Sequence, residues 1–340
     1  MAQPQVLLTD PLHPDAHERL SGWARITTLP ATLSVEQSHA ALRQAAGTVQ
    51  GLVVRRQLPA DLFERPLALR AVVRQGVGLD FIPVDRATVH RIPVGNTPGV
   101  NANAVAEYVF AALLAHSRQL ADFDASVRTG DWQVRSQAGA RTFELRGRTL
   151  GVIGFGAVGR RIGEIARHGF GMQLVTCTTT PSAAPEGIAT LSLQELFAAS
   201  DFIVIACPLT PATRGMVTAK VLAQARPGAV LVNVGRGPVV VESELAAALQ
   251  SGALAGAVLD VFETQPLPVD SALRNHPGVL LTPHLAGLTQ EAERAMGLLA
   301  VDTLRALLAG ERPGTVVNPE VFMPRFADTL TAQESTGDTT

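Results

Sequence analysis

Short runs of aliphatic and β-branched residues recur along the chain, and several precede a segment whose apolar positions have helical spacing. Continuous apolar strands that alternate with amphipathic helices are typical of parallel sheets covered by helices on both faces. The pattern therefore predicts an α/β protein built from doubly wound parallel sheets. The runs occupy residues 6–9, 51–55, 69–74, 149–156, 172–177, 202–207, 229–235, 255–261 and 279–284.

The rhythm of these runs indicates two domains. The six runs from residue 149 onward are regular enough to form one sheet of about six strands, whereas the earlier runs have a different, turn-rich spacing. A long amphipathic segment near the C-terminus ends at Gly310 and would cross back to the first domain. We therefore predict one domain from residues 1–98 and 288–325, and a second from residues 99–287.

Two further segments have a predicted conformation. Asn101 or Asn103 is placed to cap a long apolar helix that reaches about Arg128. The last residues, 326–340, are small and polar without periodicity, and we expect them to be disordered.

Composition and charge narrow the class of partner. The 340 residues contain 28 Lys and Arg against 30 Asp and Glu, which gives a net charge of −2 without a basic block for nucleic acid or an anionic membrane. No apolar run approaches the roughly 20 residues that span a bilayer, and the N-terminus does not resemble a signal peptide. We therefore expect a cytoplasmic protein that acts on a small molecule. Cys177 and Cys207 lack metal-ligand spacing, so no metal site is expected.

A glycine-rich turn supplies the clearest chemical signal. Gly154, Gly156 and Gly159 form the pattern G-x-G-x-x-G between an apolar run and a helical segment, with Ala157 and Val158 inside the turn. Gly154 permits the tight turn, Gly156 lets the backbone approach a pyrophosphate, and Gly159 allows close packing of helix and strand. The first N–H groups of the helix then face the anion. The motif predicts a dinucleotide-binding site.

The residue that would select the dinucleotide is atypical. An acidic residue normally ends the next strand and binds the ribose hydroxyls of NAD. Thr178 or a neighbouring threonine stands there instead, and the nearest acid downstream is Glu186. No local arginine attracts a 2′-phosphate either, so the expected cofactor is NAD or NADP.

Several motifs in order resemble those of the D-isomer-specific 2-hydroxyacid dehydrogenases, which include glyoxylate/hydroxypyruvate reductases and phosphoglycerate dehydrogenases. The resemblance covers about residues 50 to 318. It implies a Rossmann nucleotide domain inserted into a flavodoxin-like substrate domain, an active site in the cleft between them, and a homodimer. The motifs are RQGVGLDFIPV, NTPGVNANAVAEYV, the glycine turn, CPLTPATRGMV, the block from Arg226 to LDVFETQPLP, and LTPHLAGLT.

The resemblance implies two main catalytic residues. Arg236 in NVGRG matches the arginine that binds the substrate carboxylate and keto oxygen, and a guanidinium can hold a planar carboxylate in a bidentate manner. His284 in TPHLAG matches the acid/base histidine. Reduction of a 2-keto acid needs a proton on the oxygen as hydride reaches the carbon, and imidazolium supplies one near neutral pH.

The third catalytic position departs from the family pattern. Gln265 stands where relatives have a glutamate that binds the histidine and raises its pKa. An amide can orient His284 but supplies no negative charge to favour imidazolium. We therefore expect His284 to titrate nearer the unperturbed pKa of about 6.5 than in glutamate-bearing relatives. Formate dehydrogenases of the same superfamily also carry glutamine here.

Other positions are assigned by the same resemblance. Gly76 and Val77 match a loop whose backbone N–H groups bind the substrate carboxylate, and Asn101 matches an asparagine near substrate and nicotinamide, although capping of a helix would explain it too. Arg55 and Arg74 end strands where relatives that use phosphorylated acids place basic groups, or they are surface arginines. The positions that line the cofactor pockets of relatives are Cys207, Pro208, Val234, Gly235, Asp260 and Gly287.

The sequence thus predicts an NAD(P)-dependent oxidoreductase that interconverts a small 2-keto acid and its D-2-hydroxy acid. Glyoxylate or hydroxypyruvate is the first substrate hypothesis, because no regulatory domain follows the dehydrogenase-sized region. Two alternatives remain: a dinucleotide sensor that resembles the C-terminal-binding co-repressors, and oxidation in the manner of formate dehydrogenases.

Overall fold

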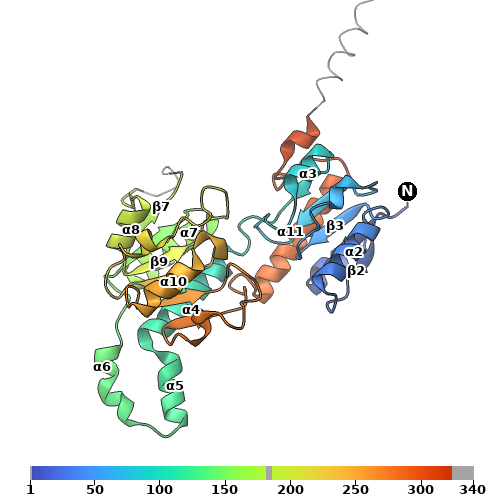
Figure 1. Ribbon diagram of the computed structural model, residues 1–340. Coiled ribbons are helices and arrows are strands. Elements are labelled where there is room, and N and C mark those ends of the chain that lie inside the picture. Colours follow the sequence, from blue (N-terminus) through green and yellow to red (C-terminus); the bar gives the residue numbers. More distant parts are fainter. Residues whose placement is uncertain (1, 181–185, 324–340) are drawn as a thin grey trace, which may run out of the picture. The chain divides into compact units, whose positions relative to one another are not determined.

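The computed structural model describes residues 2–180 and 186–323 (Figure 1). These residues form two compact units. The N-terminal unit consists of residues 2–100 and 290–323, and the central unit is Asn101–Thr289. The tail 326–340, expected to be disordered, lies outside the described residues.

The N-terminal unit is a five-stranded parallel sheet in the order β2-β1-β3-β4-β5. This order is that of flavodoxin-like folds, and it reverses between β1 and β3. The strands are β1 (Gln5–Leu8), β2 (Arg25–Thr28), β3 (Gly51–Val54), β4 (Ala71–Arg74) and β5 (Val94–Gly95). The helices are α1 (Pro14–Ser21), α2 (Val35–Ala45), α3 (Val84–Val89) and α11 (Gln290–Leu308), with 3-10 turns at Leu62–Glu64 and Pro319–Phe322.

The inner strands β3 and β4 are buried on both faces, and their alternate residues point to opposite sides. Leu52 and Val72 face a cluster that includes Leu42 of α2, while Val53 and Val73 face a cluster with Leu304 of α11. A helix from the C-terminal part of the chain therefore completes the core of the N-terminal unit. The last helix was expected to cross back to this unit, and Leu304 of α11 lies in its core.

The central unit is a seven-stranded parallel sheet in the order β12-β11-β10-β9-β6-β7-β8. Six of these strands follow the Rossmann order, and β12 adds a seventh at one edge. The sequence indicated about six strands because β8 has only two residues. The strands are β6 (Thr149–Ile153), β7 (Gln173–Cys177), β8 (Ala189–Thr190), β9 (Phe202–Ile205), β10 (Val230–Asn233), β11 (Gly256–Leu259) and β12 (Val279–Leu281).

Helices cover both faces of the central sheet, with α4 and α7 packed on one side and α8, α9 and α10 on the other. The predicted class, two doubly wound parallel-sheet units, is thereby confirmed. The helices are α4 (Ala102–Arg118), α5 (Leu120–Arg128), α6 (Ala138–Arg141), α7 (Ala157–Phe170), α8 (Leu193–Ala199), α9 (Ala219–Leu222) and α10 (Glu242–Gln250), with 3-10 turns at Gln133–Gln137, Gly237–Val239 and Ala272–Asn275.

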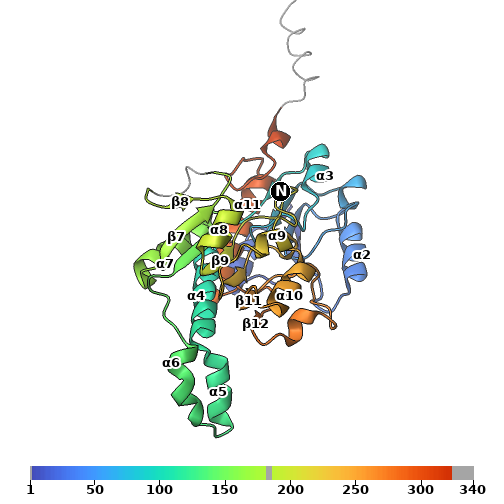
Figure 2. The same ribbon diagram turned by 60° about the vertical axis from the view of Figure 1, so that its left-hand side comes forward.

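The helix expected to run from Asn101 to about Arg128 is interrupted, so that prediction was wrong at its end. Gln119 adopts the left-handed conformation, with φ 49° and ψ 43°, and this ends α4 at Arg118. Helix α5 then starts in a new direction and, with α6, forms an arm that projects from the central unit (Figure 2). Within the described ranges, no helix has both the length and the apolar character to cross a bilayer.

Candidate functional site

The glycine turn of the central unit joins β6 to α7, and the backbone has no room for side chains at two of its positions. Gly154 has φ +91°, and a Cβ there would lie 2.7 Å from the Cys207 backbone. A Cβ at Gly159 would lie 2.2 Å from the carbonyl oxygen of Gly154. Both glycines are therefore required by the close approach of β6, β9 and α7.

Gly156 differs from these two glycines, because a Cβ at this position would meet no atom of the protein within 4 Å. It is the N-cap of the 14-residue helix α7, and its first turn receives no side-chain cap. The first N–H groups of a helix lack intrahelical partners and attract anions. Open space beside uncapped N–H groups, at Gly156, Ala157 and Val158, fits a dinucleotide pyrophosphate.

The segment after β9 lies against this turn at Cys207, and the loop after β10 packs on the same segment. Strand order reverses between β6 and β9, which is where Rossmann sheets bind dinucleotides. A Cβ at Gly235 would lie 2.8 Å from the carbonyl oxygen of Cys207, so these loops pack closely. Burial raises the pKa of the Cys207 thiol to about 11, and the side chain is neutral at physiological pH. Pro208 is exposed and Val234 is half-buried at the same edge.

Thr178 directly follows β7 at this carboxyl edge, and its hydroxyl accepts a hydrogen bond from the Thr180 backbone at 3.2 Å. The position expected to face the adenosine ribose therefore carries a half-buried hydroxyl.

Arg236 follows β10 in a loop with extended backbone. The Asn233 side chain holds this loop: its Nδ2 donates to the Arg236 carbonyl at 3.1 Å, and its Oδ1 accepts from the Gly235 N–H at 3.1 Å. Arg236 Nη1 donates to the Gly235 carbonyl at 2.7 Å. The loop places the guanidinium at the carboxyl end of the sheet.

His284 lies in the loop between β12 and α11, and Gln265 lies beside it. The His284 Nδ1–H donates to Gln265 Oε1 at 3.1 Å. This hydrogen bond keeps a proton on Nδ1. Nε2 is then the ring nitrogen that can gain or lose a proton. The residue at the atypical position therefore orients the histidine through a neutral amide.

His284 has a positive φ of 58°, which is uncommon for a residue other than glycine. The carboxylate of Asp260, only 1% exposed, holds the turn around it. Asp260 Oδ1 accepts from the Leu285 N–H at 2.8 Å and from the Thr282 hydroxyl at 2.6 Å, while Oδ2 accepts from the Ala286 N–H at 2.9 Å. Asp260 is therefore a structural anchor of the His284 turn, in addition to its position among the expected cofactor contacts.

Sequence reasoning missed two residues of this network. The Tyr108 hydroxyl lies 2.6 Å from Thr282 Oγ1, and since Thr282 donates to Asp260, Tyr108 donates to Thr282. Burial raises the pKa of Tyr108. Tyr108 is the one tyrosine of the sequence and lies on the buried helix α4, which was the available signal.

Asn101 occupies the N-cap of α4, but its side chain makes no capping hydrogen bond, so capping does not explain the residue. A Cβ at Gly287 would lie 2.7 Å from Asn101 Nδ2, so the amide packs on the His284 turn. Its Oδ1 is buried and has no hydrogen-bond partner among the described residues. Asn103, the alternative cap, lies inside α4 and donates to Glu107.

In the N-terminal unit, the loop after β4 has its own internal bonds. The Gly76 N–H donates to Thr97 Oγ1 at 2.8 Å, so it is already used within the protein. The Val77 carbonyl accepts from Asn96, and the Gly78 carbonyl accepts from Arg74. The Gly76 N–H, which the resemblance assigned to a substrate carboxylate, therefore already has a partner within the protein.

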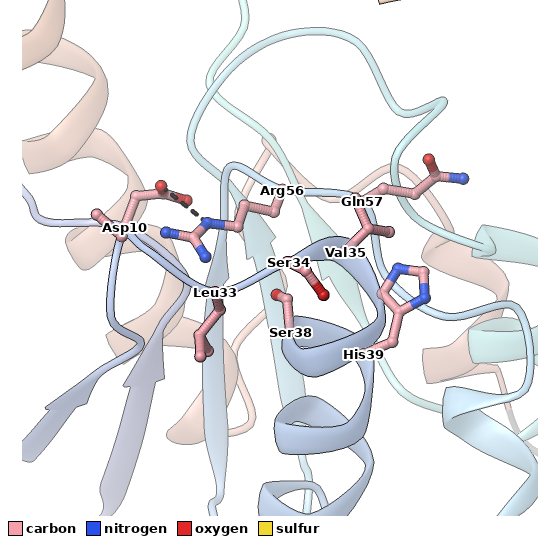
Figure 3. Close-up of a pocket in the computed structure, with 9 residues that line it drawn as sticks. Asp10, Leu33, Ser34, Val35, Ser38, His39, Arg56 and Gln57 are labelled. Atoms are coloured by element: carbon pink, nitrogen blue, oxygen red, sulfur yellow. Dashed lines mark hydrogen bonds and ion pairs between the residues drawn. The ribbon is translucent and has the colours of Figure 1, made fainter.

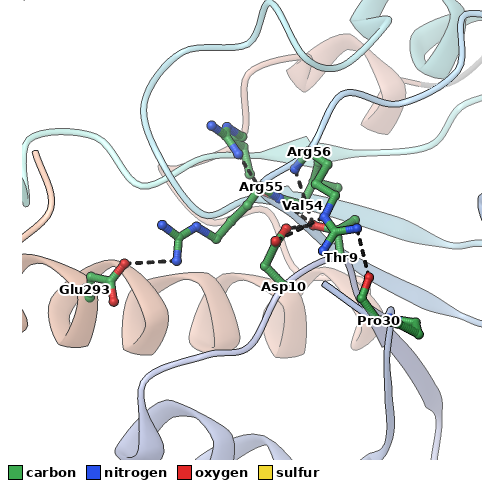
Figure 4. A network of polar contacts seen from close by, with 8 residues as sticks. Thr9, Asp10, Pro30, Val54, Arg55, Arg56 and Glu293 are labelled. Carbon is green, nitrogen blue, oxygen red and sulfur yellow. Dashed lines mark hydrogen bonds and ion pairs between the residues drawn. The ribbon is translucent and has the colours of Figure 1, made fainter. Parts of the chain in front are cut away.

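Two consecutive arginines, Arg55 and Arg56, follow β3 and pair with different partners. Arg56 Nε donates to Asp10 Oδ1 at 3.0 Å (Figure 3). Arg55 forms an ion pair with Glu293 of α11 at 2.9 Å (Figure 4). Thr9 Oγ1 accepts from the Arg55 N–H at 2.7 Å and donates to Asp10 Oδ2 at 2.8 Å, which links the two strand ends.

This architecture, a Rossmann sheet with a glycine turn and a histidine turn at one edge, defines a dinucleotide-dependent oxidoreductase fold. Residues 110–286, about half of the chain, match the family model described as "D-isomer specific 2-hydroxyacid dehydrogenase, NAD binding domain". The chain belongs to the D-isomer-specific 2-hydroxyacid dehydrogenase family, an oxidoreductase family that binds NAD(P).

The chain is similar to proteins of other organisms. A glyoxylate reductase from Pyrococcus furiosus is 39% identical over 79% of this chain and 82% of its own. A D-3-phosphoglycerate dehydrogenase from Mycobacterium bovis is 35% identical over 94% of this chain but only 61% of its own length. The crystal structure of an NADPH-dependent glyoxylate/hydroxypyruvate reductase from Sinorhizobium meliloti, with NADP and malonate, has a TM-score of 0.81 at 33% identity and covers 95% of this chain and 99% of that one.

Proposed function

We propose that the protein reduces a small, unphosphorylated 2-keto acid, glyoxylate or hydroxypyruvate, to its D-2-hydroxy acid. The observation that carries this proposal is the His284–Gln265 hydrogen bond on a turn held by the Asp260 carboxylate. It gives one imidazole a fixed position for proton transfer. The relatives named glyoxylate reductase support the substrate class.

The proposed roles follow from the chemistry of each group. A bound nicotinamide dinucleotide supplies the hydride, and Gly154, Gly156 and the α7 N-terminus would hold its pyrophosphate. Protonated His284 donates its Nε2 proton to the keto oxygen, and the imidazolium is regenerated from solvent. Arg236 pairs with the substrate carboxylate. In the N-terminal unit, the N–H groups of Val77 and Gly78 are candidate donors to an anion, because the neighbouring Gly76 N–H is bound to Thr97.

The remaining cofactor positions are assigned to the walls of the dinucleotide site. Cys207 lies against the glycine turn, Gly235 packs on Cys207 with Val234 beside it in the chain, and the Thr178 hydroxyl is suited to a ribose or to a 2′-phosphate. We therefore propose that both NAD and NADP are accepted. Gly287 and Asn101 would shape the nicotinamide end, since both pack beside His284.

The arginines of the N-terminal unit support an unphosphorylated substrate. Arg55 is neutralised by Glu293, and Arg74 is tied to the Val54 and Gly78 carbonyls and lies over the Phe81 ring at 4.6 Å. A substrate phosphate would have to compete with Glu293 for Arg55. This pairing disfavours a second anionic group at the end of β3.

A substrate panel tests this proposal. With NADH or NADPH, we expect turnover of glyoxylate and hydroxypyruvate and little turnover of phosphohydroxypyruvate. Glu293→Gln should raise kcat/KM for phosphohydroxypyruvate about fivefold relative to hydroxypyruvate, because it frees Arg55. Glu291→Gln, an exposed acid on the same helix, is the matched control and should leave the ratio unchanged. A wild-type preference for the phosphorylated acid would contradict the proposal.

We also propose a homodimer. The projecting arm exposes Leu120, Val127 and Trp132, with Trp132 70% exposed. Apolar side chains gathered on one projection are typical of an interaction surface. Light scattering after size-exclusion chromatography would give the mass of two chains.

A further inference from the structure

The N-terminal unit contains a pocket of about 340 Å³ that the proposed reaction does not use. It lies where the loops after β1 and β3 meet the start of α2, on the α2 face of the sheet (Figure 3). The strand order reverses between β1 and β3, and open parallel sheets bind ligands at such points. The volume falls within the range of small-molecule sites.

Two polar atoms on α2 are buried without a partner at this pocket. They are Ser38 Oγ and His39 Nε2, and neither forms a hydrogen bond with any described residue. Ser38 is only 3% exposed and lines the pocket together with His39. Buried polar groups are nearly always hydrogen-bonded, because an unpaired one costs about 1–3 kcal/mol. A pair of adjacent unpaired groups therefore points to a polar ligand.

Arg56 supplies a cation opposite these two groups (Figure 3). It uses Nε on Asp10 and Nη1 on the Pro30 carbonyl at 3.2 Å, which leaves N–H donors of its fork for a ligand. Both oxygens of Asp10 are occupied, one by Arg56 and the other by the Thr9 hydroxyl. The ion pair leaves the pocket close to neutral, so a singly charged anion suits it better than a dianion.

Part of the pocket lining is apolar. Leu33 and Val35 line it, and Val35 is 63% exposed on the first turn of α2. These side chains would cover the hydrocarbon part of a ligand whose charged end faces Arg56. We propose that this pocket binds a small aliphatic monocarboxylate, with Arg56 as counter-ion and with Ser38 and His39 as hydrogen-bond partners.

This site is distinct from the substrate loop, which follows β4 and carries Val77 and Gly78. The two sites differ in their donors: backbone N–H groups in the loop, and side chains in the pocket. The proposal does not depend on the proposed reaction, since a ligand without a keto group would bind as well.

Isovalerate is a suitable probe because it has no 2-keto group and cannot be reduced. Ligand-observed NMR titration of the full-length protein should show saturable binding in the millimolar range, and neutral isovaleramide and inorganic phosphate should bind more weakly. Tighter binding of phosphate, or equal binding of the amide, would overturn the assignment to a monocarboxylate. The absence of saturable isovalerate binding would overturn the site itself.

Substitutions of the lining residues test whether isovalerate binds in this pocket. Ser38→Ala removes a buried hydroxyl that has no partner, so it should fold at least as stably as the wild type and bind isovalerate about fivefold more weakly. Ser21→Ala, a serine of α1 whose hydroxyl bonds to the Glu18 carbonyl, is the control and should leave binding unchanged. Arg56→Gln should abolish binding. Unchanged affinity in a folded Ser38→Ala protein would overturn the proposal.

Discussion

Two turns at the same edge of the central sheet have different roles and are stabilised in opposite ways. The glycine turn after β6 depends on missing side chains, because backbone atoms of neighbouring segments occupy the space where a Cβ would lie. The histidine turn after β12 carries a side chain on a residue with left-handed backbone, and its N–H groups donate hydrogen bonds to a buried carboxylate. The first turn leaves room for a ligand, whereas the second fixes a reactive group.

The difference explains why one turn was easier to predict. The glycine turn lies within six consecutive residues, so its pattern is visible in the sequence. The support of His284 comes from Asp260, Thr282 and Tyr108, which lie on three segments up to 174 residues apart. Each contact depends on how the strands and α4 pack, which local sequence does not specify.

The largest change in folding stability is expected in the first turn, where substitutions of two glycines should differ. Gly159→Ala forces a Cβ into the Gly154 carbonyl and should destabilise folding by about 3 kcal/mol. Gly156→Ala places its methyl group in open space, so stability should stay within about 0.5 kcal/mol of the wild type. Chemical denaturation measures both values.

The Gly156→Ala variant also tests whether the first turn binds the dinucleotide. Gly156→Ala should weaken dinucleotide binding, measured by NADH fluorescence, although the fold is intact. Wild-type affinity in this variant would show that the pyrophosphate does not approach Gly156.

A smaller loss is expected in the second turn. Asp260→Asn replaces an acceptor oxygen by an NH₂ group that faces a donor, and it should destabilise the protein by about 2 kcal/mol. Because the amide no longer holds the His284 turn, kcat should fall more than dinucleotide affinity. Equal losses of both would mean that Asp260 acts mainly on the cofactor.

Tyr108→Phe removes only the outer hydrogen bond of this network. It serves as the graded control for Asp260→Asn and should lower kcat far less.

The smallest expected effect concerns pH. Gln265→Glu adds a negative charge beside His284, and a neighbouring anion raises the pKa of an imidazole. Reduction requires protonated His284, so activity is present below its pKa and is lost as pH rises through it. The alkaline limb of the kcat/KM profile should therefore move to higher pH in Gln265→Glu. An unchanged alkaline limb would show that the residue at position 265 does not control the protonation of His284.

Apolar patterning was sufficient to predict both sheets, because parallel strands buried on two faces form continuous apolar runs. It gives no information where the geometry depends on single dihedrals or on distant partners. The left-handed Gln119 ends α4 early, and Thr97 occupies the Gly76 N–H from a different loop. Neither feature has a local sequence signal, because glutamine and threonine adopt many other conformations and contacts.

The most direct test of the account is the oxidation of NADH and NADPH with glyoxylate and hydroxypyruvate by the wild type and by His284→Asn. Asparagine tolerates the positive φ, so the turn should persist. The account predicts turnover in the wild type, a loss of kcat of roughly 10²- to 10⁴-fold in the variant, and unchanged dinucleotide affinity. Equal turnover in the two proteins would contradict the assignment of His284 as the acid/base of the reaction.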